Sequence, residues 1–511
     1  YFRNSEFYPG LYDTFSYALG QIILLINKKF YANNIDFVMH FVNVSFSTLS
    51  ILGLYLFSKK IFNRDIALLT IILTLFNPFF FGHMGMNSKD LIVFFSLIWF
   101  CYYFYLYCTE DSDNFKYLLL FSFFIGFGSG VRLTFAVVIF PVVICGIIFL
   151  IKKYKDNYLK FYKRLLAHIP VTIFITIFLV VLCWPHIFVA YQNDNLGRFL
   201  SIIIKATLNW NAGPKIGLLN GEFYEVFNTP KSYFVYFLFY RLPIYFSLIL
   251  IFSYFLIFSK KLKILNEIKN FKYKFLILNL IAFFPIFLVL ILNANVYDNI
   301  RLFLFIIPFF SIIASFSLNQ IINTYKDSIK NKIAASIILI LFSVSFYRFI
   351  VLTPYQYTYV NFVYPSYEKT IDKFEHDYWG TSYKELVKEM KSKYTAKEVQ
   401  GFKIADCFGG DSTLLYYLNK NFGVKRLYNI DERPLRATHI VLTNRSFLDV
   451  MNNPLLGDLV DEKGAMKIKD LEKVVRTPGV KTTCFSHYDG EDQVVVTRGG
   501  AKYSSVRKLE N

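Results

Sequence analysis

The first 352 residues are dominated by long apolar runs that are separated by short polar turns. A run of about twenty apolar residues is long enough to cross a bilayer as a helix. The pattern predicts ten membrane-spanning helices, at residues 35–58, 66–84, 91–108, 117–131, 133–151, 167–188, 233–257, 275–294, 302–318 and 334–352. We therefore expect a polytopic α-helical membrane protein with a transmembrane domain over residues 35–352.

Residues 10–27 are apolar but follow a different pattern. Apolar side chains recur there at helical spacing, with Asp13 and Gln21 among the polar positions between them. This alternation is typical of an amphipathic helix that lies in the membrane interface rather than crossing it. Residues 1–34 are thus predicted to form an outer loop and an interfacial helix.

Residues 353–511 lack long apolar runs and are predicted to form a separate α/β domain. Strands are predicted over 402–408, 438–443 and 493–498, and helices over 383–393 and 412–420. Cys407 and Cys484 lie in this part, and they could pair if the domain is outside the cytoplasm. The sequence alone leaves that pairing open.

The positive charge of the chain gives it an orientation. The net charge is +19, of which +16 belongs to residues 1–352 and +3 to the remainder, so the excess accompanies the apolar half and argues against a nucleic-acid partner. Five alternate loops hold 19 Lys and Arg residues and the opposite loops hold 7. The positive-inside rule places the first set in the cytoplasm, and both residues 1–34 and the C-terminal domain outside.

Ionisable residues at the predicted outer turns are candidates for function, because charge near the membrane is costly to keep. Asn87, Lys89 and Asp90 share one turn, Arg132 follows a glycine-rich segment, and Arg301 precedes another span. Each has a simpler explanation: Arg132 alone could be an interfacial anchor, and Lys89 with Asp90 a local ion pair. Together they suit an anionic lipid headgroup, since cations bind phosphate and a carboxylate can act as a base or hold a metal.

Several motifs support this interpretation. They are YPGLY at 8–12, FGHMGMNSKD at 81–90, VYDNIRLFLFIIP at 296–308, PYQYTYVN at 354–361 and FEHDYWGTSY at 374–383. The chain resembles a bacterial member of the glycosyltransferase-C superfamily, in the branch similar to dolichyl-phosphate-mannose protein mannosyltransferases (family 39-like). The resemblance implies an inner-membrane enzyme with a periplasmic C-terminal domain. It would move a sugar, a hexose or a pentose, from a polyprenyl-phosphate-linked donor to a glycan, lipid or protein acceptor, with inversion.

The resemblance also implies roles for individual residues. Asp90 is the candidate acidic site residue and a possible metal ligand, although the sequence leaves the metal open. The donor phosphate is expected at Lys89, Arg132 and Arg301. From their place at the predicted outer face, and not from the resemblance alone, possible substrate-lining residues are Tyr8, Asn87, Glu222, Tyr297, Asp298, Asp377, Tyr378 and Trp379. For residues 377–379, packing of the C-terminal part on the membrane domain is an equal alternative. The family's catalytic base belongs to the first outer loop and is expected before residue 1, since Asp13 falls inside the following helix. Leu302 and Gly10 depart from the family pattern, in which His and Pro are usual.

Two alternatives remain from the sequence. One is a lipid or solute transporter without enzyme activity, against which the sequence shows no internal repeat and no interrupted helix pair. The other is a catalytically incomplete fragment, suggested by the missing aspartate.

Overall fold

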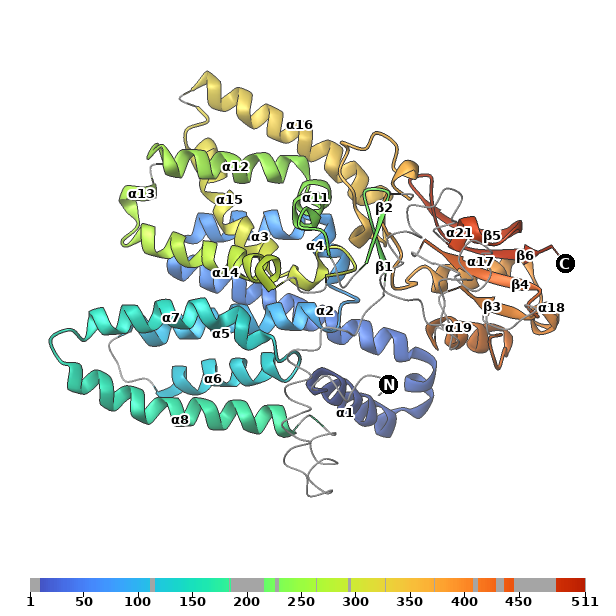
Figure 1. Ribbon diagram of the computed structural model, residues 1–511, viewed down its shortest axis with the longest axis horizontal. Helices are drawn as coiled ribbons and strands as arrows, with labels where there is room; N and C mark the ends of the chain where they lie inside the picture. The colour runs from blue at the N-terminus through green and yellow to red at the C-terminus, as the bar shows by residue number, and fades with distance from the viewer. Residues whose placement is uncertain are drawn as a thin grey trace. The chain divides into compact units, whose positions relative to one another are not determined.

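The structure is a computed structural model, shown in Figure 1. It describes residues 10–110, 115–182, 184, 216–225, 229–262, 264–292, 296–326, 328–371, 373–407, 412–428, 436–444 and 484–510. Two compact units divide the chain. The first contains Tyr1–Ala212, Tyr245–Leu292 and Arg301–Leu341, and the second contains Gly213–Ile244, Asn293–Ile300 and Phe342–Asn511.

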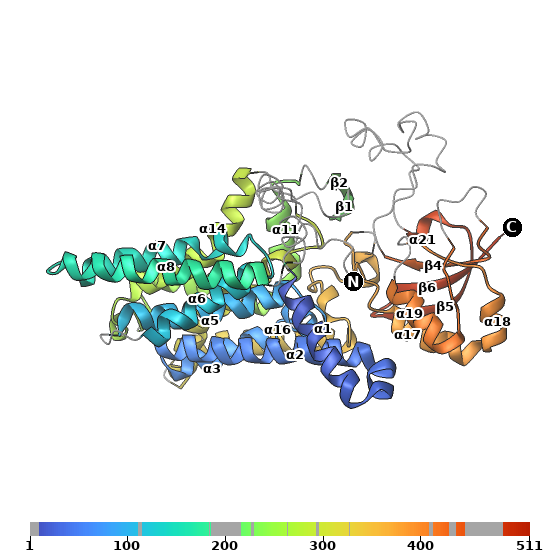
Figure 2. The same ribbon diagram turned by 90° about the horizontal axis from the view of Figure 1, so that it is seen from below.

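The first unit is a bundle of apolar helices. Its elements are α1 (Leu11–Ile26), α2 (Lys28–Ile61), α3 (Arg64–Leu75), α4 (Pro78–His83), α5 (Asp90–Thr109), α6 (Phe115–Ser129), α7 (Phe135–Lys153), α8 (Tyr158–Leu182), α12 (Ile244–Phe258), α13 (Ile264–Glu267), α14 (Phe271–Leu292), η2 (Arg301–Phe303), α15 (Ile306–Asn323) and most of α16 (Ile329–Val351). Helix α5 packs against α2, α6 and α7, and α3 packs against α15. Figure 2 shows α5, α6, α7 and α8 running side by side.

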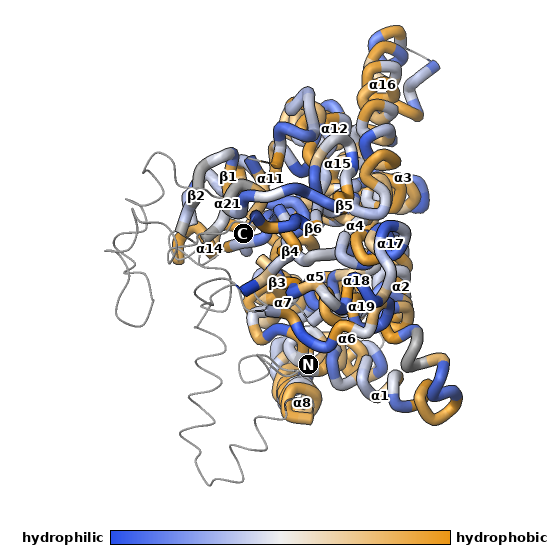
Figure 3. The backbone as a smooth tube through the Cα atoms, turned by 90° about the vertical axis from the view of Figure 1, so that its right-hand side faces the viewer, coloured by the Kyte–Doolittle hydropathy of each residue, from blue (hydrophilic) through white to orange (hydrophobic). Residues whose placement is uncertain are grey.

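Seven helices in the described part of the chain are long and apolar enough to cross a membrane. In an apolar window of 18 residues, 78% of the residues of α5 are buried. The corresponding shares are 0% in α8 and 11% in α16. Figure 3 shows hydrophobic residues prevailing along α8 and α16. A helix that is apolar yet exposed needs lipid around it, so this is a multi-pass membrane protein, as predicted.

Each of the ten predicted spans contains helix among the residues that the structure describes, but several differ from a single straight span, among them 302–318, which begins with η2 before α15. Residues 66–84 divide into α3 and α4, because Asn77 accepts a hydrogen bond from Phe80 N and Pro78 begins the new helix. Residues 117–131 become α6, which has 15 residues. The segment 233–257 is interrupted between Arg241 and Ile244, where Pro243 follows α11 (Tyr233–Arg241). The expectation that no helix pair is interrupted was therefore wrong.

The predicted interfacial helix is α1. Its first turn buries Leu11 and Tyr12, while Leu25 and Ile26 at its end are exposed. Asn27 ends α1 and caps α2, since its side chain accepts a hydrogen bond from Phe30 N at 2.9 Å. The exposed apolar face agrees with a helix that lies against lipid headgroups.

The second unit contains a four-stranded sheet flanked by helices. Its elements are β1 (Ile216–Leu219), β2 (Glu222–Glu225), α11, η3 (Gln356–Thr358), η4 (Glu368–Thr370), α17 (Tyr383–Lys393), α18 (Ala396–Gly401), β3 (Ile404–Asp406), α19 (Ser412–Phe422), β4 (His439–Thr443), α21 (Cys484–His487), β5 (Gly490–Arg498) and β6 (Ala501–Leu509). The strand order is β3-β4-β6-β5, with β3 parallel to β4 and the other pairs antiparallel. The α/β prediction is confirmed, and β6 is an additional strand.

Cys407 and Cys484 form a disulfide in this domain. Both cysteines belong to a buried cluster with Ala405, Ile440 and Leu442. The bond therefore ties the end of β3 to α21 through the core of the sheet. The pairing that the sequence left open is made.

Candidate active site

The turn between α4 and α5 is closed by local hydrogen bonds. The amide groups of Met86 and Asn87 donate to the carbonyl of His83, at 3.2 and 3.0 Å. The side-chain oxygen of Asn87 then accepts from the backbone amides of Lys89 at 3.2 Å and Asp90 at 2.8 Å. Amides at the start of a helix lack partners within the helix. Asn87 thus satisfies the amides of Lys89 and Asp90 at the start of α5 and holds Asp90, its first residue, in place.

Asp90 lies between two arginines that come from distant parts of the sequence. Its Oδ1 is 2.7 Å from Arg132 Nη2, and its Oδ2 is 3.3 Å from Arg301 Nη1. Asn87 Nδ2 also donates to Oδ2, at 3.0 Å. The Asp90 side chain is 2% exposed, and those of Arg132 and Arg301 are 19% and 11% exposed. The structure therefore brings together the carboxylate and two of the three cations that the sequence singled out.

Lys89 adds a third cation to this cluster. It lies outside the membrane-spanning helices, at the position that precedes α5. Burial lowers the pKa of its ammonium group, and the nearby charge of Arg132 lowers it further, while Asp13 and Asp90 oppose the shift. Asp13 of α1 is therefore close enough to Lys89 to act on its charge, which its position inside a helix had not suggested.

Helices α1 and α2 hold the two turns of the site. Leu11 N donates to Gly130 O at 3.1 Å, which joins α1 to the turn before Arg132. His40 Nδ1 lies 2.7 Å from Gly85 O, and Asn43 Nδ2 donates to the same oxygen at 3.2 Å. The hydroxyl of Tyr12 donates to Asn43 Oδ1. A single face of α2 thus supports both α1 and the turn that carries Asp90.

This support from α2 was not predicted from the sequence. A signal was present. His40, Asn43 and Ser47 are three and four residues apart, so they share one face of an otherwise apolar helix. Ser47 Oγ donates to Met84 O at 2.8 Å, which completes the set of contacts with the turn.

The other predicted substrate-lining residues are in different places. Tyr8 lies outside the described residues. Glu222 is the first residue of β2, opposite Leu219. Tyr297 and Asp298 belong to the second unit, where Asp298 is buried and has a positive φ of 54°. Their lining role stays a prediction.

The segment 377–379 is largely built into the second unit. Asp377 is buried, and its oxygens accept hydrogen bonds from Thr381 N at 2.8 Å and Ser382 N at 3.0 Å. The hydroxyl of Tyr357 also donates to it. Tyr378 is fully buried, whereas Trp379 is partly exposed. Of the three residues, Trp379 is the one whose side chain reaches the surface.

Arg241, which ends α11, was not singled out in the sequence. It is fully buried and donates to the carbonyls of Thr358, Tyr359 and Glu375 and to the side-chain oxygen of Asn299. One guanidinium therefore joins three separate segments of the second unit. A charged residue within the apolar run 233–257 was the signal that could have found it.

The surroundings of Asp90 bear on whether this residue could hold a metal. Both carboxylate oxygens of Asp90 pair with guanidinium groups. A divalent cation at Asp90 would need these oxygens as ligands, so the arrangement does not fit one. Within the described ranges, no three His, Cys, Asp or Glu side chains are grouped so that they could hold a metal ion.

Comparisons with known proteins point to one family. Residues 22–184 match the sequence profile of the family described as dolichyl-phosphate-mannose-protein mannosyltransferase. The resemblance that the sequence motifs indicated is thus confirmed over this range, and the matched segment contains Asp90 and Arg132.

Solved structures and curated sequences complete the comparison. ArnT from Cupriavidus metallidurans bound to undecaprenyl phosphate is 10% identical, with a TM-score of 0.45, over 92% of this chain and 84% of that chain. AglB, the oligosaccharyltransferase of Archaeoglobus fulgidus, in complex with an inhibitory peptide and a dolichol-phosphate, is 11% identical, with a TM-score of 0.42, over 85% of this chain and 61% of that chain. No curated protein sequence matches the chain.

Proposed function

We propose that this protein is an integral-membrane glycosyltransferase that uses a polyprenyl-phosphate-linked sugar as its donor. The observation that carries the proposal is the buried Asp90, paired with Arg132 and Arg301 in a membrane domain whose residues 22–184 match the mannosyltransferase profile. Such a donor is an anionic lipid, so its sugar and phosphate would meet these residues while its chain stays among the helices. The reaction belongs to the side of the membrane predicted to be periplasmic.

The proposed reaction needs two kinds of assistance. The acceptor hydroxyl attacks the anomeric carbon, the bond from that carbon to the phosphate oxygen breaks, and the hydroxyl proton passes to a base. The leaving phosphate gains negative charge, which Arg132, Arg301 and Lys89 are placed to stabilise. Asp90 holds both arginines in position before the donor arrives. We assign no residue of this chain as the base.

The test is sugar transfer in membranes that contain the intact protein. Lipid-linked hexose, pentose and aminosugar donors are supplied in parallel, which also identifies the sugar. We expect Asp90→Asn and Arg301→Ala each to lower transfer by about 10²-fold or more, as removal of a charge-stabilising group does. Asp65→Asn is the matched control, because Asp65 is an exposed carboxylate in the first turn of α3. Normal transfer in both site variants, with the protein correctly folded by size-exclusion chromatography, would contradict the assignment.

One observation favours a second candidate, a lipid transporter. The pair α11 and α12 is interrupted between Arg241 and Ile244, and interrupted helices are common at the binding sites of transporters. The same membranes separate the two functions. A transporter would move the labelled donor lipid across the bilayer with its sugar still attached, whereas a transferase releases the sugar to an acceptor.

A further inference from the structure

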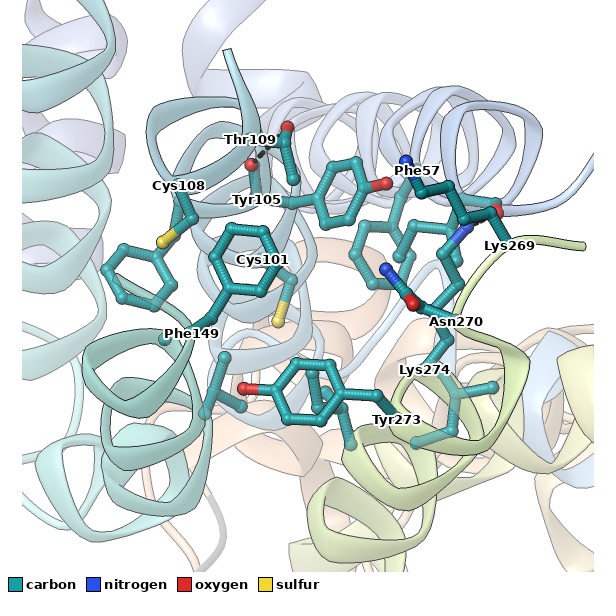
Figure 4. Close-up of a pocket in the computed structure, with 16 residues that line it drawn as sticks. Phe57, Cys101, Tyr105, Cys108, Thr109, Phe149, Lys269, Asn270, Tyr273 and Lys274 are labelled. Atoms are coloured by element: carbon teal, nitrogen blue, oxygen red, sulfur yellow. Dashed lines mark hydrogen bonds between the residues drawn. The ribbon is translucent and has the colours of Figure 1, made fainter. Parts of the chain in front are cut away.

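A cavity of about 350 Å³ is lined by residues toward the ends of α2, α5, α7 and α14 (Figure 4). Asp90 lies at the opposite end of α5. Its wall is mainly apolar and includes Phe57, Cys101, Phe104, Val142, Ile277 and Leu278. Pockets that hold small ligands have volumes of about 300–1,000 Å³ and walls of this kind. The cavity is therefore large enough for part of an apolar chain.

One side of the cavity is basic. Lys269, Asn270 and Lys274 lie together on that side in Figure 4, and Cys108 and Phe149 lie on the other. Lys269 is exposed, and Lys274 is half-buried, with its ammonium group donating to Ile61 O at 2.6 Å. Among the described residues, those that line the cavity include these two lysines and no aspartate or glutamate. The charge of the rim therefore favours an anion.

The position of the cavity limits the kind of anion. The cavity is formed by the C-terminal ends of α2, α5 and α7 and the N-terminal end of α14. The charge pattern of the loops places these helix ends on the cytoplasmic side of the membrane. Lysines at this depth meet the headgroups of the cytoplasmic leaflet. A soluble phosphate compound would match the lysines but would leave the apolar wall unused.

We propose that this cavity binds an anionic phospholipid of the cytoplasmic leaflet. One acyl chain enters between α5 and α14, and the phosphate is held by Lys269 and Lys274. This site is separate from the proposed donor site, and it requires no sugar transfer. The bound lipid would fill space between α5, α7 and α14 that the side chains leave empty.

The test is photolabelling of the full-length protein in nanodiscs. The probe is phosphatidylglycerol with a diazirine in one acyl chain, and phosphatidylcholine with the same group is the comparison. We expect the anionic probe to label peptides that contain residues 101–109 and 269–278. Unlabelled phosphatidylglycerol should displace it, and inorganic phosphate should not. Equal labelling by both lipids, displacement by inorganic phosphate, or displacement by a polyprenyl phosphate in preference to phosphatidylglycerol would overturn the proposal.

Matched variants locate the site. Lys269→Gln should lower labelling about fivefold, the effect of one lysine near an anionic lipid. Lys272→Gln, which changes an exposed lysine outside the lining, should leave labelling unchanged. Ile277→Trp should fill the cavity and abolish labelling, whereas Leu276→Trp, at an exposed position beside it, should not. Unchanged labelling in both Lys269→Gln and Ile277→Trp would show that the lipid binds elsewhere.

Discussion

A carboxylate that is 2% exposed at the start of a membrane-spanning helix needs compensation for its charge, and Asp90 receives it from Arg132, Arg301 and Asn87. The same contacts restrain the two arginines. A donor phosphate would therefore meet guanidinium groups that are already oriented, which lowers the entropic cost of binding.

Lys89 gives the site a pH dependence whose sign can be stated. The pKa of its ammonium group is lowered by burial and by Arg132, so the group loses its positive charge at a lower pH than an ordinary lysine. Donor affinity should therefore fall as the pH rises, beginning below the usual lysine pKa of about 10.4. The KM for the donor, measured across alkaline pH, checks this.

Two variants test whether Lys89 is responsible for that change. Lys89→Arg should remove the alkaline rise in KM, because arginine stays charged. Asp13→Asn should move the rise to lower pH, because Asp13 raises the pKa of Lys89. An alkaline rise that is the same in Lys89→Arg and in the unaltered protein would assign it to another group.

The sequence predicted the charged residues of the site better than their supports. Asp90, Arg132 and Arg301 could be grouped because the topology places all three turns on one face of the membrane. Asn43 and Arg241 stand out only as polar residues in apolar runs, and their partners could not be predicted, since each bonds to backbone carbonyls or side chains of distant segments. No local pattern indicates which carbonyl a polar side chain will meet.

At the scale of elements, the glycine-rich end of α6 determines how closely its neighbours approach. A Cβ on Gly130 would lie 2.8 Å from Leu11 Cδ1 and 3.1 Å from Gly126 O. A Cβ on Gly128 would lie 2.6 Å from the ring of Phe135. Only glycine lets α1 and α7 pack against the turn that presents Arg132.

Gly130→Ala should therefore destabilise the membrane domain by about 1–3 kcal/mol, the usual cost of overpacking. It should also lower sugar transfer, because α1 and the turn before Arg132 are pushed apart. The midpoint of thermal unfolding in detergent and the transfer rate measure the two effects. Gly85→Ala is the control, since its Cβ would lie 3.8 Å from Val44 Cγ2, an ordinary contact. Equal effects of the two substitutions would refute the packing argument.

Element boundaries show where apolar patterns are insufficient. The break between α3 and α4 falls at Asn77 and Pro78, and the interruption after α11 falls at Pro243, so both signals were in the sequence. They were obscured because the apolar character continues across each break. Strand β6 was missed although Gly499 and Gly500 form the turn that pairs it with β5.

At the scale of the whole molecule, the disulfide between Cys407 and Cys484 bears on orientation. Disulfides persist in oxidising compartments, and the charge bias of the loops independently predicts that the C-terminal domain is periplasmic. The general architecture was predictable because long apolar runs and loop charges are properties of the sequence alone. The packing of the sheet was not, since β3 and β4 pair across a long separation.

The disulfide should form in cells and stabilise the C-terminal domain by about 2–4 kcal/mol. Cys407→Ser with Cys484→Ser should lower the midpoint of unfolding in detergent, and a reductant should lower it equally in the unaltered protein. Cys101→Ser, which removes a buried free thiol of α5, is the control. The reductant should lower its unfolding midpoint by the same amount as in the unaltered protein. Maleimide labelling of both cysteines in unreduced cells would contradict the prediction.

The same disulfide joins two cysteines that are 77 positions apart in the sequence, so the chain between them forms a covalently closed loop. A protease that cuts once inside this loop would leave the two fragments attached. The nick would be invisible on a gel without reductant, and two bands would appear after reduction. A protease could therefore be added to sealed vesicles of either orientation, and the reduced gel would show on which side the C-terminal domain is cut. Both fragments would stay attached to the protein until reduction.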